Sequence, residues 1–217
     1  MGHRRVFPQP DEPGLAVGPP AYGAAMLLAT TCPGCGSIGP APCAACVEEM
    51  ALSPPVPRPA SLDGCRALLA YEGPAREVVA QLKYRNARVP AAWLAEGIAG
   101  LSGPEQADVV TWAPTTDLRR RHRGFDHAEL LARRVARSWG VPCRSLLQRA
   151  PGPPQTGRSL LARRHGPAFL TRGRIDGLRV VVIDDVVTTG ATLDAAGRAL
   201  RAMGARSVIG LAAAHPR

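Results

Sequence analysis

Lysine is almost absent from this sequence. Of the 27 basic side chains only Lys83 is a lysine, and the other 26 are arginines. A P-loop nucleotide site needs a lysine directly after its glycine-rich turn, but Gln81 and Leu82 precede Lys83. A dinucleotide-binding fold needs Gly-x-Gly-x-x-Gly after a strand, and no predicted strand is followed by such a run. The sequence therefore excludes two common kinds of phosphate-binding protein.

Aromatic residues and long apolar runs are also scarce. Aromatic residues make up 4% of the chain and hydrophobic residues 46%, so valine, leucine and alanine must fill the core. No apolar run is long enough to cross a bilayer. The Arg4-Arg5 pair lacks the apolar segment of a signal peptide, because Met26–Ala29 is too short. We therefore expect a cytoplasmic protein with no membrane insertion.

Acidic residues are outnumbered by basic ones, 17 against 27, which gives a net charge of +10 and a pI near 10.3. A basic balance of this size favours anionic partners. It admits two classes of partner, nucleic acid and strongly anionic small molecules.

The six cysteines are unevenly distributed. Four of them form two Cys-x-x-Cys pairs with seven residues between the pairs: Cys32, Cys35, Cys43 and Cys46. Such pairs supply the four thiolates of a tetrahedral Zn²⁺ site. A redox pair normally starts a helix after a strand, which neither pair is expected to do, and disulfides would require an export signal. We predict structural zinc, and we expect Cys65 and Cys143 to be buried apolar residues.

Composition divides the chain into four segments. Residues 1–25 are rich in proline and glycine and are predicted to be disordered, so Met26 is the expected natural start. Residues 26–52 form the predicted zinc ribbon, and 53–60 are a stiff Pro-rich linker. Residues 61–217 alternate predicted strands and helices, which indicates an α/β domain with a parallel sheet. Its expected strands are 67–71, 108–113, 145–148, 179–183 and 206–214, and its expected helices are 75–84, 89–101, 127–139 and 193–203.

One stretch, Val180 to Thr192, carries the clearest chemical signal. A run of β-branched residues ends at Asp184-Asp185 and predicts a buried parallel strand. A loop of small, hydroxyl-bearing residues follows and leads into a helix. Backbone N–H groups at such a loop and helix start favour a phosphate. Adjacent carboxylates would repel that phosphate, so they indicate sugar hydroxyls or Mg²⁺ instead.

This stretch resembles the phosphoribosyl pyrophosphate (PRPP) motif of type I phosphoribosyltransferases. The resemblance implies that Asp184 and Asp185 hold the ribose hydroxyls. It also implies that the loop surrounds the 5′-phosphate, through Thr188, Thr189, Gly190, Ala191 and Thr192.

Two basic elements are further candidates. The compact ammonium of Lys83 suits a pyrophosphate contact, although a solvated position is the alternative. The loop 115–126 follows a predicted strand and carries Arg119, Arg120, Arg121 and Arg123, which suit pyrophosphate or, alternatively, nucleic acid. The irregular segment 149–167 is a candidate lid, with Gln155, Arg163 and Arg164 as its notable polar residues.

The order of these pieces resembles the ComF/GntX-type proteins, which join a zinc ribbon to a type I phosphoribosyltransferase domain. The similarity runs from about Met26 to His215. It rests on the four cysteines, on the PRPP motif and on four shorter segments: Tyr71-Glu-Gly-Pro-Ala-Arg, Leu82-Lys-Tyr-Arg, Arg123-Gly-Phe-Asp and Gln155-Thr-Gly. This chain departs from the family pattern at Trp112-Ala113-Pro114, at Asp126 and near Gly166, positions that bear on base specificity and turnover.

The resemblance implies Mg²⁺-dependent transfer of a phosphoribosyl group to a nitrogen acceptor with release of pyrophosphate. Lys83 and Arg123 would then meet the pyrophosphate. Family members are linked to DNA uptake in competent bacteria, which gives a second hypothesis. In it the chain is a non-catalytic PRPP sensor or accessory protein, with single-stranded DNA or DNA-uptake proteins as partners. The sequence does not identify the acceptor base.

Overall fold

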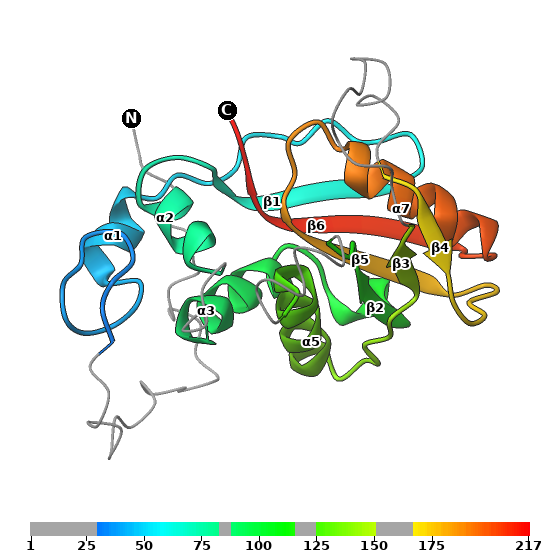
Figure 1. The fold of residues 1–217 in the computed structure, drawn as a ribbon, viewed down its shortest axis with the longest axis horizontal. Helices are drawn as coiled ribbons and strands as arrows, with labels where there is room; N and C mark the ends of the chain where they lie inside the picture. Colours follow the sequence, from blue (N-terminus) through cyan, green and yellow to red (C-terminus); the bar gives the residue numbers. More distant parts are fainter. Residues whose placement is uncertain (1–29, 83–87, 116–124, 151–166) are drawn as a thin grey trace, which may run out of the picture.

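A four-stranded parallel sheet forms the centre of the molecule, a computed structural model that describes residues 30–82, 88–115, 125–150 and 167–217 (Figure 1). The strand order is β1-β6-β5-β2, and every neighbouring pair is parallel. A two-stranded antiparallel ribbon, β3-β4, lies beside it. The strands are β1 (Gly64–Ala70), β2 (Val109–Trp112), β3 (Leu147–Arg149), β4 (Phe169–Thr171), β5 (Arg179–Val186) and β6 (Ser207–His215). The helices are α1 (Ala44–Glu49), α2 (Gly73–Gln81), α3 (Arg88–Ala99), η1 (Pro104–Gln106), α5 (His127–Trp139) and α7 (Ala191–Ala202).

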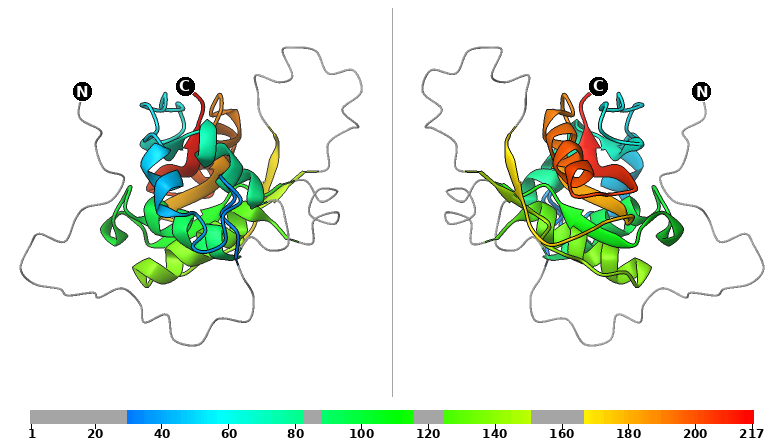
Figure 2. Two further views of the ribbon diagram at one scale, coloured as in Figure 1. Left: turned by 90° about the vertical axis from the view of Figure 1, so that its left-hand side faces the viewer. Right: turned by 90° about the vertical axis from the view of Figure 1, so that its right-hand side faces the viewer.

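Helices cover both faces of the sheet. Alternate residues of a strand point to opposite faces, and β5 follows this rule with two separate cores. Val181 and Ile183 pack into the core formed with α2, α3 and α5. Val180 and Val182 pack into the core under α7. Figure 2 shows α7 on the opposite side of the sheet from the green helices α3 and α5. Burial on both faces explains why the middle of β5, Val180 to Ile183, consists of β-branched residues.

The N-terminal cysteine segment packs against the sheet domain. Cys32, Cys46 and Met50 belong to the same core as residues of α2. Leu52 pairs in an antiparallel bridge with Leu69 of β1. The segment is therefore attached to β1 and α2 by hydrogen bonds as well as by apolar contacts.

Most predicted elements match the structure closely. The helix predicted at 127–139 is α5 without a change of boundary, because Asp126 caps its start and Gly140 ends it in the left-handed conformation. The short strand predicted at 145–148 is β3, which begins two residues later and ends one residue later. α1, β4 and η1 were not predicted. Among the described helices, none has the length and hydrophobicity that a membrane span requires.

Candidate functional site

The four clustered cysteines come together as predicted. Their sulfur atoms all lie within 4.8 Å of one another, and the Sγ atoms of Cys35 and Cys43 are 3.6 Å apart. A tetrahedron with Zn–S bonds of about 2.3 Å has edges of about 3.8 Å, so this spacing suits a metal ion. Cys65 and Cys143 are not part of the cluster, and all six cysteines are free thiols. The four thiols therefore meet the geometric requirement for a structural zinc centre.

The surroundings of the thiols favour a shared cation. Burial alone would raise the pKa of Cys32, but hydrogen bonds from the amides of Cys43, Cys35 and Gly34 lower it to about 6. Burial and the neighbouring thiols instead raise the pKa of Cys46 well above its ordinary value. Since like charges at this distance oppose one another, full ionisation of the four thiols needs a positive ion between them.

One step of the sequence reasoning about this cluster was wrong. Neither Cys-x-x-Cys pair was expected at a helix start, yet Cys43 is the N-cap of α1 and Cys46 lies in its first turn. The pair resembles a redox motif in that one respect. The nearby Cys32 and Cys35 sulfurs still distinguish the cluster from an isolated redox pair.

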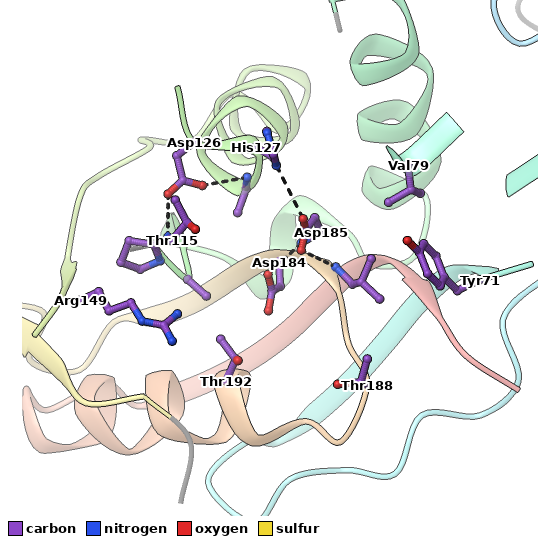
Figure 3. Close-up of a pocket in the computed structure, with 14 residues that line it drawn as sticks. Tyr71, Val79, Thr115, Asp126, His127, Arg149, Asp184, Asp185, Thr188 and Thr192 are labelled. Carbon is purple, nitrogen blue, oxygen red and sulfur yellow. Dashed lines mark hydrogen bonds and ion pairs between the residues drawn. The ribbon is translucent and has the colours of Figure 1, made fainter. Parts of the chain in front are cut away.

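A second site lies where β2 and β5 end. A cavity of about 460 Å³ opens there (Figure 3). In a parallel α/β sheet this edge is where ligands bind. Its walls combine acidic, hydroxyl-bearing, basic and apolar side chains: Tyr71, Val79, Ala113, Pro114, Thr115, Asp126, His127, Ala128, Arg149, Asp184, Asp185, Val186, Thr188 and Thr192.

The adjacent carboxylates on β5 are each fixed by a backbone amide. Asp184 accepts a hydrogen bond from the amide of Asp185 through Oδ1, at 2.9 Å. Asp185 accepts one from the amide of Val186 through Oδ1, at 2.8 Å. The Oδ2 atom of Asp185 lies 3.7 Å from Nδ1 of His127. Both carboxylates line the cavity.

The two carboxyl groups differ in their electrostatics. Burial and the charge of Asp185 raise the pKa of Asp184 well above its ordinary value. Burial acts in the same direction on Asp185, but the nearby His127 imidazole and a hydrogen bond from the Val186 amide leave its pKa lowered. Hydroxyl groups or a divalent cation would relieve the repulsion between two ionised carboxylates. The donor set, two hard oxygen ligands beside a hydroxyl-rich loop, fits Mg²⁺ and sugar hydroxyls.

The loop after β5 leads into α7 through a residue with positive φ. Gly190, the N-cap of α7, has φ 76° and adopts the left-handed conformation, which suits glycine. Thr188 and Thr192 line the cavity, whereas Thr189, Gly190 and Ala191 are not among its wall residues. The hydroxyl of Thr189 accepts from the Ala191 amide at 3.4 Å. The loop thus begins and ends at the cavity and brings the start of a helix to it.

Several predicted site residues lie outside the described part of the chain. They are Lys83, Arg119, Arg120, Arg121, Arg123, Gln155, Arg163 and Arg164. Their assigned roles stay predictions.

The cavity also contains residues that we did not predict as site residues. Tyr71 and His127 are the polar ones, whereas Thr115 and Asp126 are the ends of the predicted loop 115–126 and Arg149 begins the candidate lid 149–167. Tyr71 follows β1, a strand of the parallel sheet, so the rule that ligands bind at the carboxyl ends of such strands could have found it. Figure 3 shows the Arg149 side chain extending from β3 toward the carboxylate pair. His127 had no such signal, because it was predicted only as the start of a helix.

Comparisons with known proteins found one matching family model and several solved structures of low sequence identity. A family model described as "Phosphoribosyl transferase domain" matches residues 124–216. A purine phosphoribosyltransferase from Pyrococcus horikoshii is 21% identical over 56% of this chain and 69% of its own, with a TM-score of 0.34. Hypoxanthine-guanine phosphoribosyl transferase from L. donovani is 16% identical over 64% and 71%, with a TM-score of 0.34. Glutamine PRPP amidotransferase from B. subtilis is 22% identical over 61% of this chain but 30% of its own, with a TM-score of 0.42.

No curated protein sequence matches this chain. The family model spans the β5 strand, the acidic pair, the hydroxyl-rich loop and β6. With the parallel sheet it confirms the predicted fold class, a type I phosphoribosyltransferase fold preceded by four clustered cysteines.

Proposed function

We propose that this chain is a ComF/GntX-type phosphoribosyltransferase that binds PRPP with Mg²⁺ and transfers the phosphoribosyl group to a nitrogen acceptor. The bond between C1 of the ribose and pyrophosphate breaks, and a bond from C1 to the acceptor nitrogen forms. The acceptor then loses its proton, and pyrophosphate leaves. One observation carries the proposal: an adjacent carboxylate pair and a hydroxyl-rich loop that starts a helix face one cavity.

The carboxylates and the loop would divide the ligand between them. Asp184 and Asp185 accept hydrogen bonds from the ribose hydroxyls. Backbone N–H groups and hydroxyls of the loop, with the start of α7, bind the 5′-phosphate. PRPP carries both kinds of group on one ribose, whereas inorganic phosphate carries only one. Fixing the ribose at two points would hold C1 near the acceptor, and such positioning is a large part of catalysis.

The rest of the cavity suits the remaining parts of the reaction. Mg²⁺, when bound with PRPP, neutralises charge on the pyrophosphate. Arg149 adds a guanidinium on the side of the β3-β4 ribbon, and we propose Lys83 and Arg123 as further pyrophosphate contacts. The apolar walls at Val79 and Ala113 suit a flat acceptor base. We propose that the four cysteines hold Zn²⁺ in a structural role.

The test is titration calorimetry of the protein with PRPP in the presence of Mg²⁺, and separately with inorganic phosphate. Asp184→Asn and Asp185→Asn should each weaken PRPP about tenfold or more, the cost of losing a hydrogen bond to a charged group. Phosphate affinity should stay the same or rise, because a repelling charge has been removed. Unchanged PRPP affinity in the double variant contradicts the proposal.

Turnover needs a separate measurement. Pyrophosphate release from PRPP should appear with at least one base of a purine and pyrimidine panel. PRPP binding without release for any base would favour the non-catalytic sensor. DNA binding that weakens steeply with salt would favour an accessory role in DNA uptake.

A further inference from the structure

His127 is a buried polar residue at the candidate site that the proposed chemistry does not use. Its exposed fraction is 5%, and it lines the cavity from the first turn of α5. Its Nδ1 atom lies 3.7 Å from Oδ2 of Asp185. Its Nε2 atom is buried and has no hydrogen-bond partner among the described residues. Buried polar atoms are nearly always paired, so the contact with Asp185 is the polar interaction that accounts for this imidazole.

The backbone fixes the position of the imidazole ring. Asp126, the preceding residue, accepts from the amides of Thr115 at 2.8 Å and Ala128 at 3.1 Å. This cap ties the start of α5 to the segment that leaves β2. The ring of Phe125 meets the imidazole edge-on, with centroids 5.3 Å apart and planes at 69°. The capped helix start and the Phe125 ring thus favour the observed position of the imidazole beside Asp185.

The imidazole and a backbone amide hold opposite ends of one carboxylate. Oδ1 of Asp185 accepts from the Val186 amide at 2.8 Å, and Oδ2 faces Nδ1 of His127. Asp184 has a comparable amide contact at Oδ1 but no imidazole at Oδ2. A carboxylate fixed at both oxygens keeps its plane, and with it the direction of its free lone pairs. The 3.7 Å separation is long for a hydrogen bond, and contacts of this kind commonly shorten when the ligand binds.

We infer that His127 is a positioning residue for Asp185: its Nδ1–H donates to Oδ2 and aims the carboxylate at a ribose hydroxyl of PRPP. The inference rests on the proposed function. It also places a proton on Nδ1, because among the described residues only that nitrogen faces an acceptor. His127 acts through Asp185 and does not need to touch the ligand.

Two amide substitutions test the assignment atom by atom. The side-chain nitrogen of asparagine lies close to where histidine has Nδ1, and that of glutamine lies close to where histidine has Nε2. His127→Phe keeps the bulk of the ring without a donor. We expect His127→Phe to weaken PRPP with Mg²⁺ about tenfold and to leave inorganic phosphate affinity unchanged. His127→Asn should restore most of the lost affinity, and His127→Gln should not.

The result that overturns the inference is also specific. PRPP affinity in His127→Phe equal to that of the unaltered chain would show that the imidazole positions nothing. Equal losses in all three variants, together with a lower melting temperature, would show a structural role in the core. A combined His127→Phe/Asp185→Asn variant should bind PRPP no more weakly than Asp185→Asn alone, because both changes disrupt the same interaction. Additive losses of PRPP affinity would contradict the inference that His127 acts through Asp185.

The same titrations separate this inference from the proposed function. If the unaltered chain binds no PRPP, both ideas fail together. If it binds PRPP and Asp185→Asn loses that binding while His127→Phe does not, only the role of His127 is wrong.

Discussion

Asp184 and Asp185 are neighbours at the end of β5, but the structure shifts the pKa values of their carboxyl groups in opposite directions. Burial and the adjacent charge raise the pKa of Asp184. The nearby His127 imidazole and a hydrogen bond from the Val186 amide outweigh burial at Asp185 and lower its pKa. The fold therefore favours the charged form of the Asp185 carboxyl group and disfavours the charged form of the Asp184 carboxyl group.

This asymmetry predicts that Asp184→Asn stabilises the fold near neutral pH. A group whose pKa is raised on folding contributes stability below its unfolded pKa and loses it as the pH rises through the folded value. Near neutral pH the folded state therefore disfavours the charged form of Asp184, and an amide removes that cost. The melting temperature should rise by about 2–4 °C for each kcal/mol recovered, while PRPP affinity falls. Thermal unfolding between pH 4 and pH 8 measures the change, and the gain should shrink toward the acidic end.

Asp185→Asn is the matched control for that prediction. The lowered pKa of Asp185 means that its charge contributes stability above the unfolded pKa and that this stability is lost as the pH falls. Its replacement should lower the melting temperature at pH 7 or leave it unchanged. A rise equal to that of Asp184→Asn would contradict the assigned asymmetry.

The cysteine cluster should bind one Zn²⁺ per chain. Cys43→Ser should lose nearly all of the metal, because the cluster then has three thiolates. Cys65→Ser is the control, since Cys65 lies outside the cluster and burial raises the pKa of its thiol to about 11. Elemental analysis of the purified variants measures how much zinc each one retains. Equal metal loss in both would show that the ligand set is wrong.

Removal of that metal should lower the affinity for PRPP as well as the stability of the N-terminal segment. A Cβ atom on Gly34 would lie 3.1 Å from Cβ of Pro74, so the cysteine turn packs directly on the start of α2. Val79 of α2 and the nearby Tyr71 form one wall of the cavity. We expect a zinc chelator to lower both the melting temperature and PRPP affinity, measured with Mg²⁺ restored in excess. Unchanged PRPP affinity in the metal-free chain would show that this wall of the cavity does not depend on the metal.

Gly190→Ala should impair both stability and phosphate binding. Gly190 has φ 76°, and a Cβ atom there would approach Cγ of Pro59 to 2.9 Å. A left-handed alanine costs about 1 kcal/mol or more, and the loop must shift to avoid Pro59. Calorimetry with PRPP and with inorganic phosphate should show weaker binding of both.

Gly177→Ala separates these two effects. Gly177 has a similar φ, 72°, but a Cβ atom there meets nothing within 4 Å, and it precedes β5 at the end of the strand away from the cavity. It should lose stability through backbone strain while keeping its affinity for phosphate and PRPP. If both glycine variants lose affinity equally, general destabilisation explains the effect.

The sequence predicted the central strand and the acidic pair because both depend on local pattern. The β-branched residues of β5 and the amphipathic pattern of α5 act over a few neighbouring positions. The short β4 carries no pattern of its own and forms only by pairing with β3, 20 residues away along the chain as measured from Arg149 to Phe169. The contribution of His127 to the cavity also depends on a distant element, the end of β5. Contacts between segments far apart in sequence leave no local periodicity. The position of β4 and the contribution of His127 could therefore be found only from the structure.

The antiparallel bridge between Leu52 and Leu69 has a consequence for how copies of the chain behave together. β1 is the outer strand of the sheet, and an open outer strand invites another chain to add to it. The amides of Ser53 and Ala70 donate to the carbonyls of Leu68 and Ala51, so the segment next to the cysteine cluster occupies that edge. If loss of the metal frees this segment, the exposed edge favours self-association that increases with protein concentration. The zinc centre would then keep the protein monodisperse as well as folded.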